Sequence, residues 1–343
     1  MGDGMRVAFL FPGQGAQYVG MGEDLYREYP VVREVFARAS RAARLDLEEL
    51  CFRGPAEQLN LTEHTQPAVL TVSWAVTQVL AAHGVVPDAA AGLSLGEYTA
   101  LVAARALDFE EAVALVRRRG RYMQEAVPPG EGAMAAIMGM GAREVEEICR
   151  RAQNEGVVEP VNYNCPGQIV VAGHAGAVRE AMRLAREAGA RRVQELAVSA
   201  PFHSSLMLPA RRRLAVDLAA ARIADPALPV VANVHADYAR SGEEVRRLLE
   251  EQVDHPVRWE DCVRRLVADG VGLFVEAGPG TVLAGFCKRI CPEVPVFSVG
   301  DLPSLERLLE TARGSAAAPR GGPAAQGGAG HGGRRLDSRG EVC

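Results

Sequence analysis

A glycine-flanked serine offers the clearest candidate for chemistry, because residues 92–96 fit the pattern G-x-S-x-G: Gly92-Leu93-Ser94-Leu95-Gly96. Small flanking residues permit a tight turn from strand to helix, and this turn exposes the serine hydroxyl for nucleophilic attack. A short apolar run, 89–93, precedes Ser94, and a helical pattern follows over 96–106. The same turn places the Leu95 amide at a helix N-terminus, where it can stabilise an oxyanion.

A serine hydroxyl is a weak nucleophile and needs a base, for which the chain has seven histidines. We favour His203, because it lies in the turn-rich stretch 200–205 and catalytic bases are often placed on loops. The only aspartate between Ser94 and His203 is Asp108, at the end of the helix that follows the nucleophile. We therefore expect a serine–histidine pair that is oriented by a group other than aspartate.

Two further residues could act on a substrate held at the serine. Gln14 lies in a glycine-rich turn that fails the nucleotide-binding pattern G-x-G-x-x-G, because Tyr18 occupies the last glycine position. Gln14 is instead a candidate for the second oxyanion donor. Arg119 ends a run of three arginines. If buried near the serine, it could bind a substrate carboxylate in a bidentate manner; the alternative is an exposed helical arginine.

The order of the expected elements indicates an α/β protein with an inserted subdomain. Residues 128–197 read as β-α-β-β-α-β, which is the order of a ferredoxin-like unit. Residues 1–127 and 198–313 would form the catalytic core, with a helix over 24–43. The strands expected in this core cover 7–11, 89–93, 228–234, 271–276 and 294–299. Residues 314–343, rich in Gly, Ala, Pro and Arg, are expected to be a disordered tail.

Composition narrows the class of protein further. The formal net charge of −5 over 343 residues is not that of a nucleic-acid binder. The longest apolar run near the start, 7–11, is too short to span a membrane. Seven cysteines lack the spacing of a zinc site, so no metal is expected. Scattered thiols without a framework favour a reducing compartment, and we expect a cytoplasmic protein without a signal sequence.

Seven sequence blocks in order make the chain resemble the malonyl-CoA:acyl carrier protein transacylases of fatty acid synthesis, over residues 5 to about 312. These blocks cover 11–17, 92–98, 119–124, 132–134, 161–168, 201–204 and 276–280. The resemblance implies an α/β-hydrolase-like core with a ferredoxin-like insert. This sequence departs from the family pattern at Leu93, where relatives often have His, and at Arg258, where they often have Gln.

The resemblance also implies a role for each candidate residue. Ser94 would be acylated, His203 would be the base, and Gln14 and Leu95 would form the oxyanion hole. Arg119 would hold the malonyl carboxylate. A main-chain carbonyl would orient the histidine, with its source expected in 255–258. The residues implied to line the pocket are Met123, Met134, Asn162 and Phe202.

The implied reaction is a ping-pong transfer of malonyl from malonyl-CoA to the phosphopantetheine thiol of acyl carrier protein. No cofactor is expected, since the coenzyme A thioester is a substrate. A ring at Phe202 would crowd a branched acyl group, although a methyl-sized difference discriminates by only about 1–3 kcal/mol. Basic residues are expected to dock an acidic carrier: Arg191, Arg192, Lys288 and Arg289.

Three alternatives stay open from the sequence. A serine esterase or thioesterase would release the acid to water, and a non-catalytic carrier-binding module would keep the fold without forming an acyl-enzyme. A transferase could also serve a polyketide assembly line instead of fatty acid synthesis.

Overall fold

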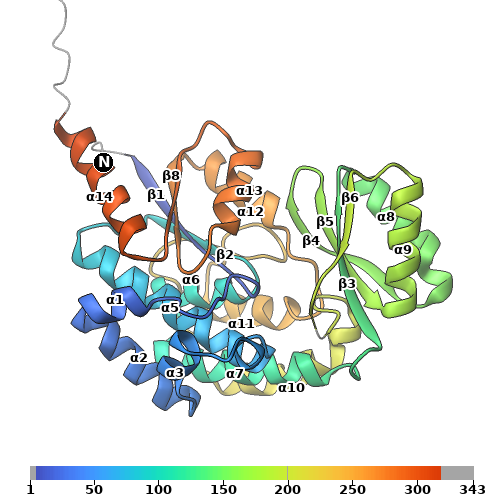
Figure 1. Cartoon of the computed structure of the whole chain (residues 1–343), viewed down its shortest axis with the longest axis horizontal. Coiled ribbons are helices and arrows are strands. Elements are labelled where there is room, and N and C mark those ends of the chain that lie inside the picture. The colour runs from blue at the N-terminus through green and yellow to red at the C-terminus, as the bar shows by residue number, and fades with distance from the viewer. Residues whose placement is uncertain (1–4, 199, 318–343) are drawn as a thin grey trace, which may run out of the picture.

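A computed structural model of the chain describes residues 5–198 and 200–317, which form two β-sheets and the helices around them (Figure 1). The first sheet has five parallel strands in the order β7-β2-β1-β8-β9. Its strands are β1 (Arg6–Phe11), β2 (Ala89–Gly92), β7 (Val230–Val231), β8 (Val271–Ala277) and β9 (Val296–Val299). The expected α/β fold class is confirmed.

Helices cover both faces of this parallel sheet, as its buried, largely apolar strands require. Alternate side chains of β1 face opposite sides: Phe9 and Phe11 pack with α2, α5, α6 and α7, whereas Ala8 and Leu10 pack with α12 and α13. The helices of the core are α1 (Glu23–Glu28), α2 (Pro30–Ala43), α3 (Leu47–Phe52), α4 (Ala56–Leu59), α5 (Thr62–Ala82), α6 (Leu95–Ala103), α7 (Phe109–Glu125), α10 (Leu208–Ala220), α11 (Gly242–Glu251), α12 (Trp259–Ala268), α13 (Val282–Ile290) and α14 (Leu302–Ala317).

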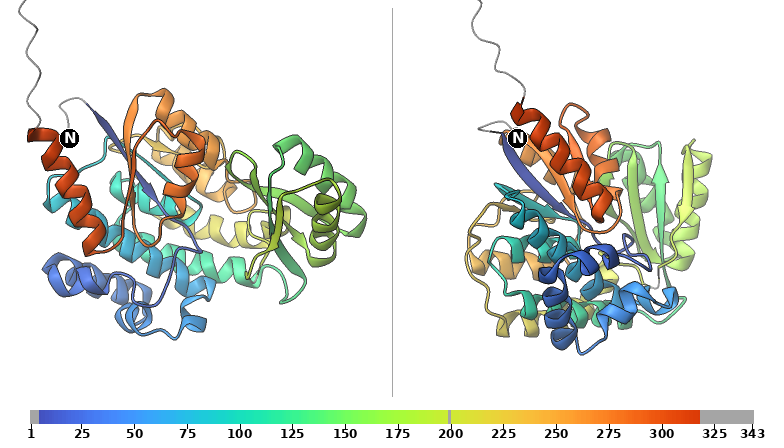
Figure 2. Two further views of the ribbon diagram at one scale, coloured as in Figure 1. Left: turned by 45° about the horizontal axis from the view of Figure 1, so that its top comes forward. Right: turned by 60° about the vertical axis from the view of Figure 1, so that its left-hand side comes forward.

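The second sheet is antiparallel and has the strand order β4-β5-β3-β6. All its elements come from one stretch of chain: β3 (Gly132–Met138), α8 (Ala142–Ala152), β4 (Val158–Cys165), β5 (Gln168–His174), α9 (Ala175–Glu187) and β6 (Arg192–Glu195). This β-α-β-β-α-β order and pairing match a ferredoxin-like unit. The unit lies at the end of the molecule opposite α14 (Figure 2).

The helices α8 and α9 cover only one face of the antiparallel sheet. Ile137 and Val171 pack under these helices, whereas Ala136 and Val170, the residues directly before them, belong to the main core cluster. Because side chains alternate along a strand, the helix-free face of the insert is turned toward the parallel-sheet core. This face provides one wall of the cavity described below.

Three expected elements differ from the structure. The helix expected over 24–43 is divided into α1 and α2, because Tyr29 is extended and Pro30 begins a new helix. The strand expected over 228–234 shortens to Val230–Val231, because the chain then turns and the Ala236 amide donates to the Ala232 carbonyl at 2.9 Å. Helix α14 continues to Ala317, past the expected start of the tail; residues 318–343 lie outside the described part. Among the described residues, no helix is long and apolar enough to cross a membrane.

Candidate active site

Ser94 lies on a sharp turn between β2 and α6, at the carboxyl edge of the parallel sheet. Its φ of 53° and ψ of −104° are unusual for a residue that is not glycine. The flanking glycines are needed for close packing: a Cβ on Gly92 would lie 1.9 Å from the carbonyl carbon of Gly96. A Cβ on Gly96 would lie 2.0 Å from the carbonyl oxygen of Phe11. The structure therefore has the serine turn that the sequence pattern predicts.

His203 lies within proton-transfer distance of the serine, because its Nε2 is 2.7 Å from Ser94 Oγ. Its Nδ1 is 2.7 Å from the main-chain oxygen of Gln252, which can only accept a hydrogen bond. Nδ1 therefore carries the proton, and Nε2 is free to accept the serine proton. The orienting carbonyl was expected within 255–258; that expectation is wrong, since the chain turns after α11 and presents Gln252.

Burial keeps this histidine neutral. His203 is 4% exposed, and its burial, together with the charge of Arg119, lowers its pKa to about 3. The hydrogen bond to Gln252 opposes this shift but does not outweigh it. The imidazole is consequently in its basic form at neutral pH, as a proton acceptor for serine must be.

Arg119 is buried beside the serine and is not an exposed helical arginine. It is 1% exposed, and its Nη2 donates to Ser94 Oγ at 3.1 Å. The guanidinium also donates to the side-chain oxygens of Gln66 and Gln252, both at 2.9 Å, and lies 5.4 Å from the ring centroid of Tyr98. Desolvation lowers the arginine pKa, and nothing among its described hydrogen-bond partners is a carboxylate. Such a cation is suited to an anionic ligand.

A buried polar network, which sequence reasoning missed, holds the backbone of the serine. Asn233 Oδ1 accepts from the Ser94 amide at 2.7 Å, and Gln252 Nε2 donates to the Ser94 carbonyl at 3.1 Å. One carboxylate oxygen of Glu97 accepts from the Asn233 amide at 2.9 Å and from Gln252 Nε2 at 2.7 Å. Only Glu97 carried a signal, since it directly follows the serine motif.

The two expected oxyanion donors flank the serine. Leu95 is the first residue of α6, where a main-chain amide has no acceptor within the helix. Gln14 follows β1 in the neighbouring turn, and its side chain donates to Thr62 Oγ1 at 3.3 Å. With its side chain engaged, Gln14 would offer its main-chain amide to the reacting centre. Both residues line the same cavity as Ser94.

This cavity has a volume of about 190 Å³ and lies between the core and the helix-free face of the insert. It brings together every candidate catalytic and pocket residue from the sequence. Its lining includes Gln14, Ser94, Leu95, Arg119, Met123, Met134, Asn162, Phe202 and His203. It also includes Gln66, Asn164, Leu196, Val198, Val282 and Phe286, which the sequence did not single out.

The four basic residues expected to dock a carrier lie outside the cavity, and all are exposed. Arg191 and Arg192 lie at the start of β6, and Lys288 and Arg289 lie in the last turn of α13. Arg289 also has a structural contact, since it donates to the Pro166 carbonyl at 2.5 Å and to Gln168 Oε1 at 2.9 Å. It therefore ties α13 to the β4–β5 turn.

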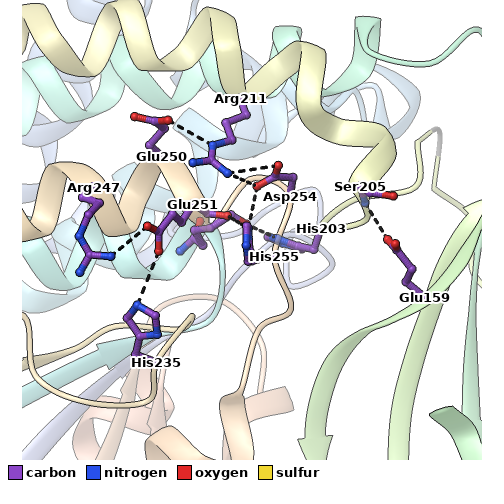
Figure 3. Close-up of polar contacts among 11 residues, drawn as sticks. Glu159, His203, Ser205, Arg211, His235, Arg247, Glu250, Glu251, Asp254 and His255 are labelled. Atoms are coloured by element: carbon purple, nitrogen blue, oxygen red, sulfur yellow. Dashed lines mark hydrogen bonds and ion pairs between the residues drawn. The ribbon is translucent and has the colours of Figure 1, made fainter.

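Ion pairs brace the segment that carries Gln252. Arg211 of α10 contacts Glu250 and Asp254, each at 3.2 Å, and Asp254 lies 2.8 Å from His255. Figure 3 shows this group beside His203, with Arg247 paired to Glu251 on the other side. These contacts fix the end of α11 on both sides of the residue that orients the histidine.

The α/β core, the strained serine and the buried neutral histidine form the kind of centre that can transfer an acyl group through a serine ester. The acyl transferase domain family matches residues 8–304. The malonyl CoA-acyl carrier protein transacylase of Bacillus subtilis is 46% identical over 307 residues, which cover 89% of this chain and 97% of that protein. The chain belongs to the malonyl CoA-acyl carrier protein transacylase family.

Solved structures agree with this assignment. The transacylase from Clostridium perfringens superposes with a TM-score of 0.88 at 42% identity, covering 91% of this chain and 98% of that one. A malonyl-transacylase in complex with a type II polyketide acyl carrier protein superposes with a TM-score of 0.87 at 44% identity, covering 89% of this chain and 99% of that one.

Proposed function

We propose that this chain transfers malonyl from malonyl-CoA to the phosphopantetheine thiol of acyl carrier protein, through a malonyl ester on Ser94. The observation that carries the proposal is the convergence of Ser94, His203 and Arg119 within hydrogen-bond distance in one cavity. The family assignment at 46% identity supports the same substrates.

In the first half-reaction, His203 Nε2 takes the Ser94 proton as Oγ attacks the thioester carbonyl. The Leu95 and Gln14 main-chain amides would stabilise the oxyanion. The carbon–sulfur bond then breaks, and the proton on Nε2 passes to the coenzyme A thiolate. The carrier thiol repeats these steps in reverse, and Ser94 recovers its hydroxyl.

Arg119 provides selection for a free carboxylate. Gln66 accepts from its Nη1 and Gln252 from its Nη2, and these two contacts hold Nη2 toward Ser94. A malonyl carboxylate would replace the neutral serine oxygen as the partner of Nη2. An acyl group without a carboxylate would leave the buried guanidinium without a counter-charge, which is unfavourable. Met123, Met134, Asn162 and Phe202 would shape the space around the acyl group.

The reaction as proposed needs no cofactor or metal, because the coenzyme A thioester supplies the acyl group. We also propose a cytoplasmic location, supported by six buried free cysteines among the described residues.

The pathway we favour is fatty acid elongation. A polyketide assembly line is the second candidate, favoured by the likeness to the malonyl-transacylase solved with a polyketide carrier. Comparing transfer rates to a fatty acid carrier and a polyketide carrier distinguishes them.

Incubation of the protein with malonyl-CoA tests the proposal. A mass increase of one malonyl group on Ser94 that persists until holo-carrier is added supports transfer. Rapid loss of the group to water without a carrier would indicate a thioesterase, and absence of labelling would indicate a binding module. Either of these results would overturn the proposed transfer.

A further inference from the structure

Asn164 presents an unmet hydrogen-bond acceptor in the wall of the active-site cavity. The side chain lines the cavity and is 7% exposed, and its Oδ1 has no hydrogen-bond partner among the described residues. Burying an amide oxygen without a partner is unfavourable, and native proteins rarely leave such a group unsatisfied. The position in the cavity suggests that a ligand provides the missing donor.

The local fold of β4 directs this amide into the cavity. The pairing of β4 with β5 shifts register between Tyr163 and Cys165, so Asn164 lies at a bulge. Bulges of this kind re-aim side chains and are frequent beside active sites. The adjacent Tyr163 points the other way, since its hydroxyl donates to Glu146 of α8 at 2.9 Å.

The strand is also fixed to the core on this side. The Tyr163 amide donates to the Val257 carbonyl at 2.9 Å, and the Val257 amide donates to the Val161 carbonyl at 2.8 Å. These two main-chain bonds hold the bulged part of β4 against the catalytic half of the molecule. The acceptor on Asn164 is therefore presented from a rigid element, which favours recognition over an accidental orientation.

The neighbours of Asn164 place it toward the α13 end of the cavity. Cys165, the next residue, packs in one cluster with Leu93 and Phe286. Val282 of α13 lines the cavity and is 47% exposed, whereas Arg119 lines it and is 1% exposed. With the acyl carboxylate at the buried arginine, the sulfur and the chain attached to it would extend toward α13.

We infer that Asn164 Oδ1 accepts a hydrogen bond from a secondary amide N–H of the pantetheine arm of both substrates. This inference rests on the proposed function, because coenzyme A and the carrier share that arm. Its first amide nitrogen lies two carbons from the sulfur, so it enters the cavity with the thioester. A side-chain amide is a suitable partner for another amide, since each offers one acceptor and at least one donor.

A pair of small substrates isolates this hydrogen bond. The malonyl thioester of N-acetylcysteamine keeps the amide N–H, and the malonyl thioester of 2-acetoxyethanethiol replaces that N–H with oxygen. For the wild-type protein, we expect kcat/KM for acylation of Ser94 to be about two- to tenfold higher with the amide, as for one neutral hydrogen bond. In Asn164→Leu, which is similar in size, the preference should disappear.

Asn164→Asp keeps an acceptor at the same position and should keep a preference for the amide, even if the leucine variant does not fold. Equal rates for the two substrates with wild type, or an unchanged preference in Asn164→Leu, would overturn the inference. Failure of the proposed function gives a different result, because wild type would then form no malonyl-Ser94 from malonyl-CoA.

Discussion

Gln252 Nε2 donates a hydrogen bond to Glu97 at 2.7 Å, and this contact ties three parts of the active site together. The side-chain oxygen of Gln252 accepts from Arg119, and its main-chain oxygen accepts from His203. Because Glu97 accepts the amide hydrogen, it fixes which end of the Gln252 side chain faces the arginine. One glutamine thus orients both His203 and Arg119.

Glu97→Gln is expected to change how stability depends on pH. Burial raises the pKa of Glu97 to about 7 from 4.5, against the opposing hydrogen bonds of Asn233 and Gln252. Between these values the folded protein binds more protons than the unfolded chain, so wild-type stability falls as pH rises. In Glu97→Gln this decrease, which is on the order of 3 kcal/mol in the wild type, should be absent. Urea unfolding at several pH values measures the free energy of unfolding as a function of pH. Identical pH dependence in the variant and the wild type would contradict the raised pKa of Glu97.

The buried histidine acts on stability with the opposite sign. The folded pKa of His203 is lowered to about 3, so the unfolded chain binds more protons between that pH and about 6.5. The free energy of unfolding should therefore fall as the pH falls through this window, and it should fall less in His203→Gln than in the wild type. Urea unfolding over the same pH range measures this change, with substitution of the exposed His83 (His83→Gln) as the control. A steeper acid loss in His203→Gln than in wild type would refute the buried neutral state.

The rate of serine acylation should depend weakly on pH. Because the His203 pKa lies at about 3, the base stays unprotonated from pH 5 to 8, and single-turnover acylation by malonyl-CoA should be nearly constant. His203→Ala should lower that rate by about 10²–10⁴-fold through loss of general-base catalysis. Quenched-flow mass spectrometry measures both. An acid limb centred near pH 6.5 in the wild type would show that the base titrates as an ordinary histidine.

Arg119→Ala should reduce malonyl transfer selectively. Loss of a charge-assisted contact predicts a fall in kcat/KM for malonyl-CoA of about tenfold or more, with acetyl transfer spared or improved. Arg119→Lys keeps a charge but not the planar fork, so its malonyl rate should stay below that of wild type. Steady-state kinetics with both thioesters provide the measurement. Equal losses for malonyl and acetyl would argue against carboxylate recognition.

Charge reversal of the proposed docking residues should weaken binding of the carrier without changing binding of coenzyme A. Arg191→Glu, Arg192→Glu and Lys288→Glu are expected to raise KM for holo-carrier several-fold, since exposed charges mainly steer association. Arg150→Glu, on the exposed side of α8, is the control. Arg289 is unsuited to this test because it also holds the β4–β5 turn. Carrier kinetics that match wild type in all three variants would rule out this surface.

The sequence predicted those parts of the protein that depend on local pattern. The turn at Ser94 requires glycine on both sides for steric reasons, so the glycine pattern predicts the turn. The order of elements in the insert follows from hydrophobic periodicity. The orienting carbonyl was placed a few residues too late, because a main-chain oxygen has no side-chain signature. Gln252, Asn233 and Asn164 were missed for a related reason: their roles depend on contacts between segments far apart in the chain.

Intact-protein mass spectrometry of wild type and Ser94→Ala after brief exposure to malonyl-CoA tests the central claim most directly. The account predicts one malonyl group on wild type, none on Ser94→Ala, and its quantitative transfer to holo-carrier once the carrier is added. Labelling of Ser94→Ala to the same extent, or a wild-type adduct that the carrier cannot remove, would contradict it.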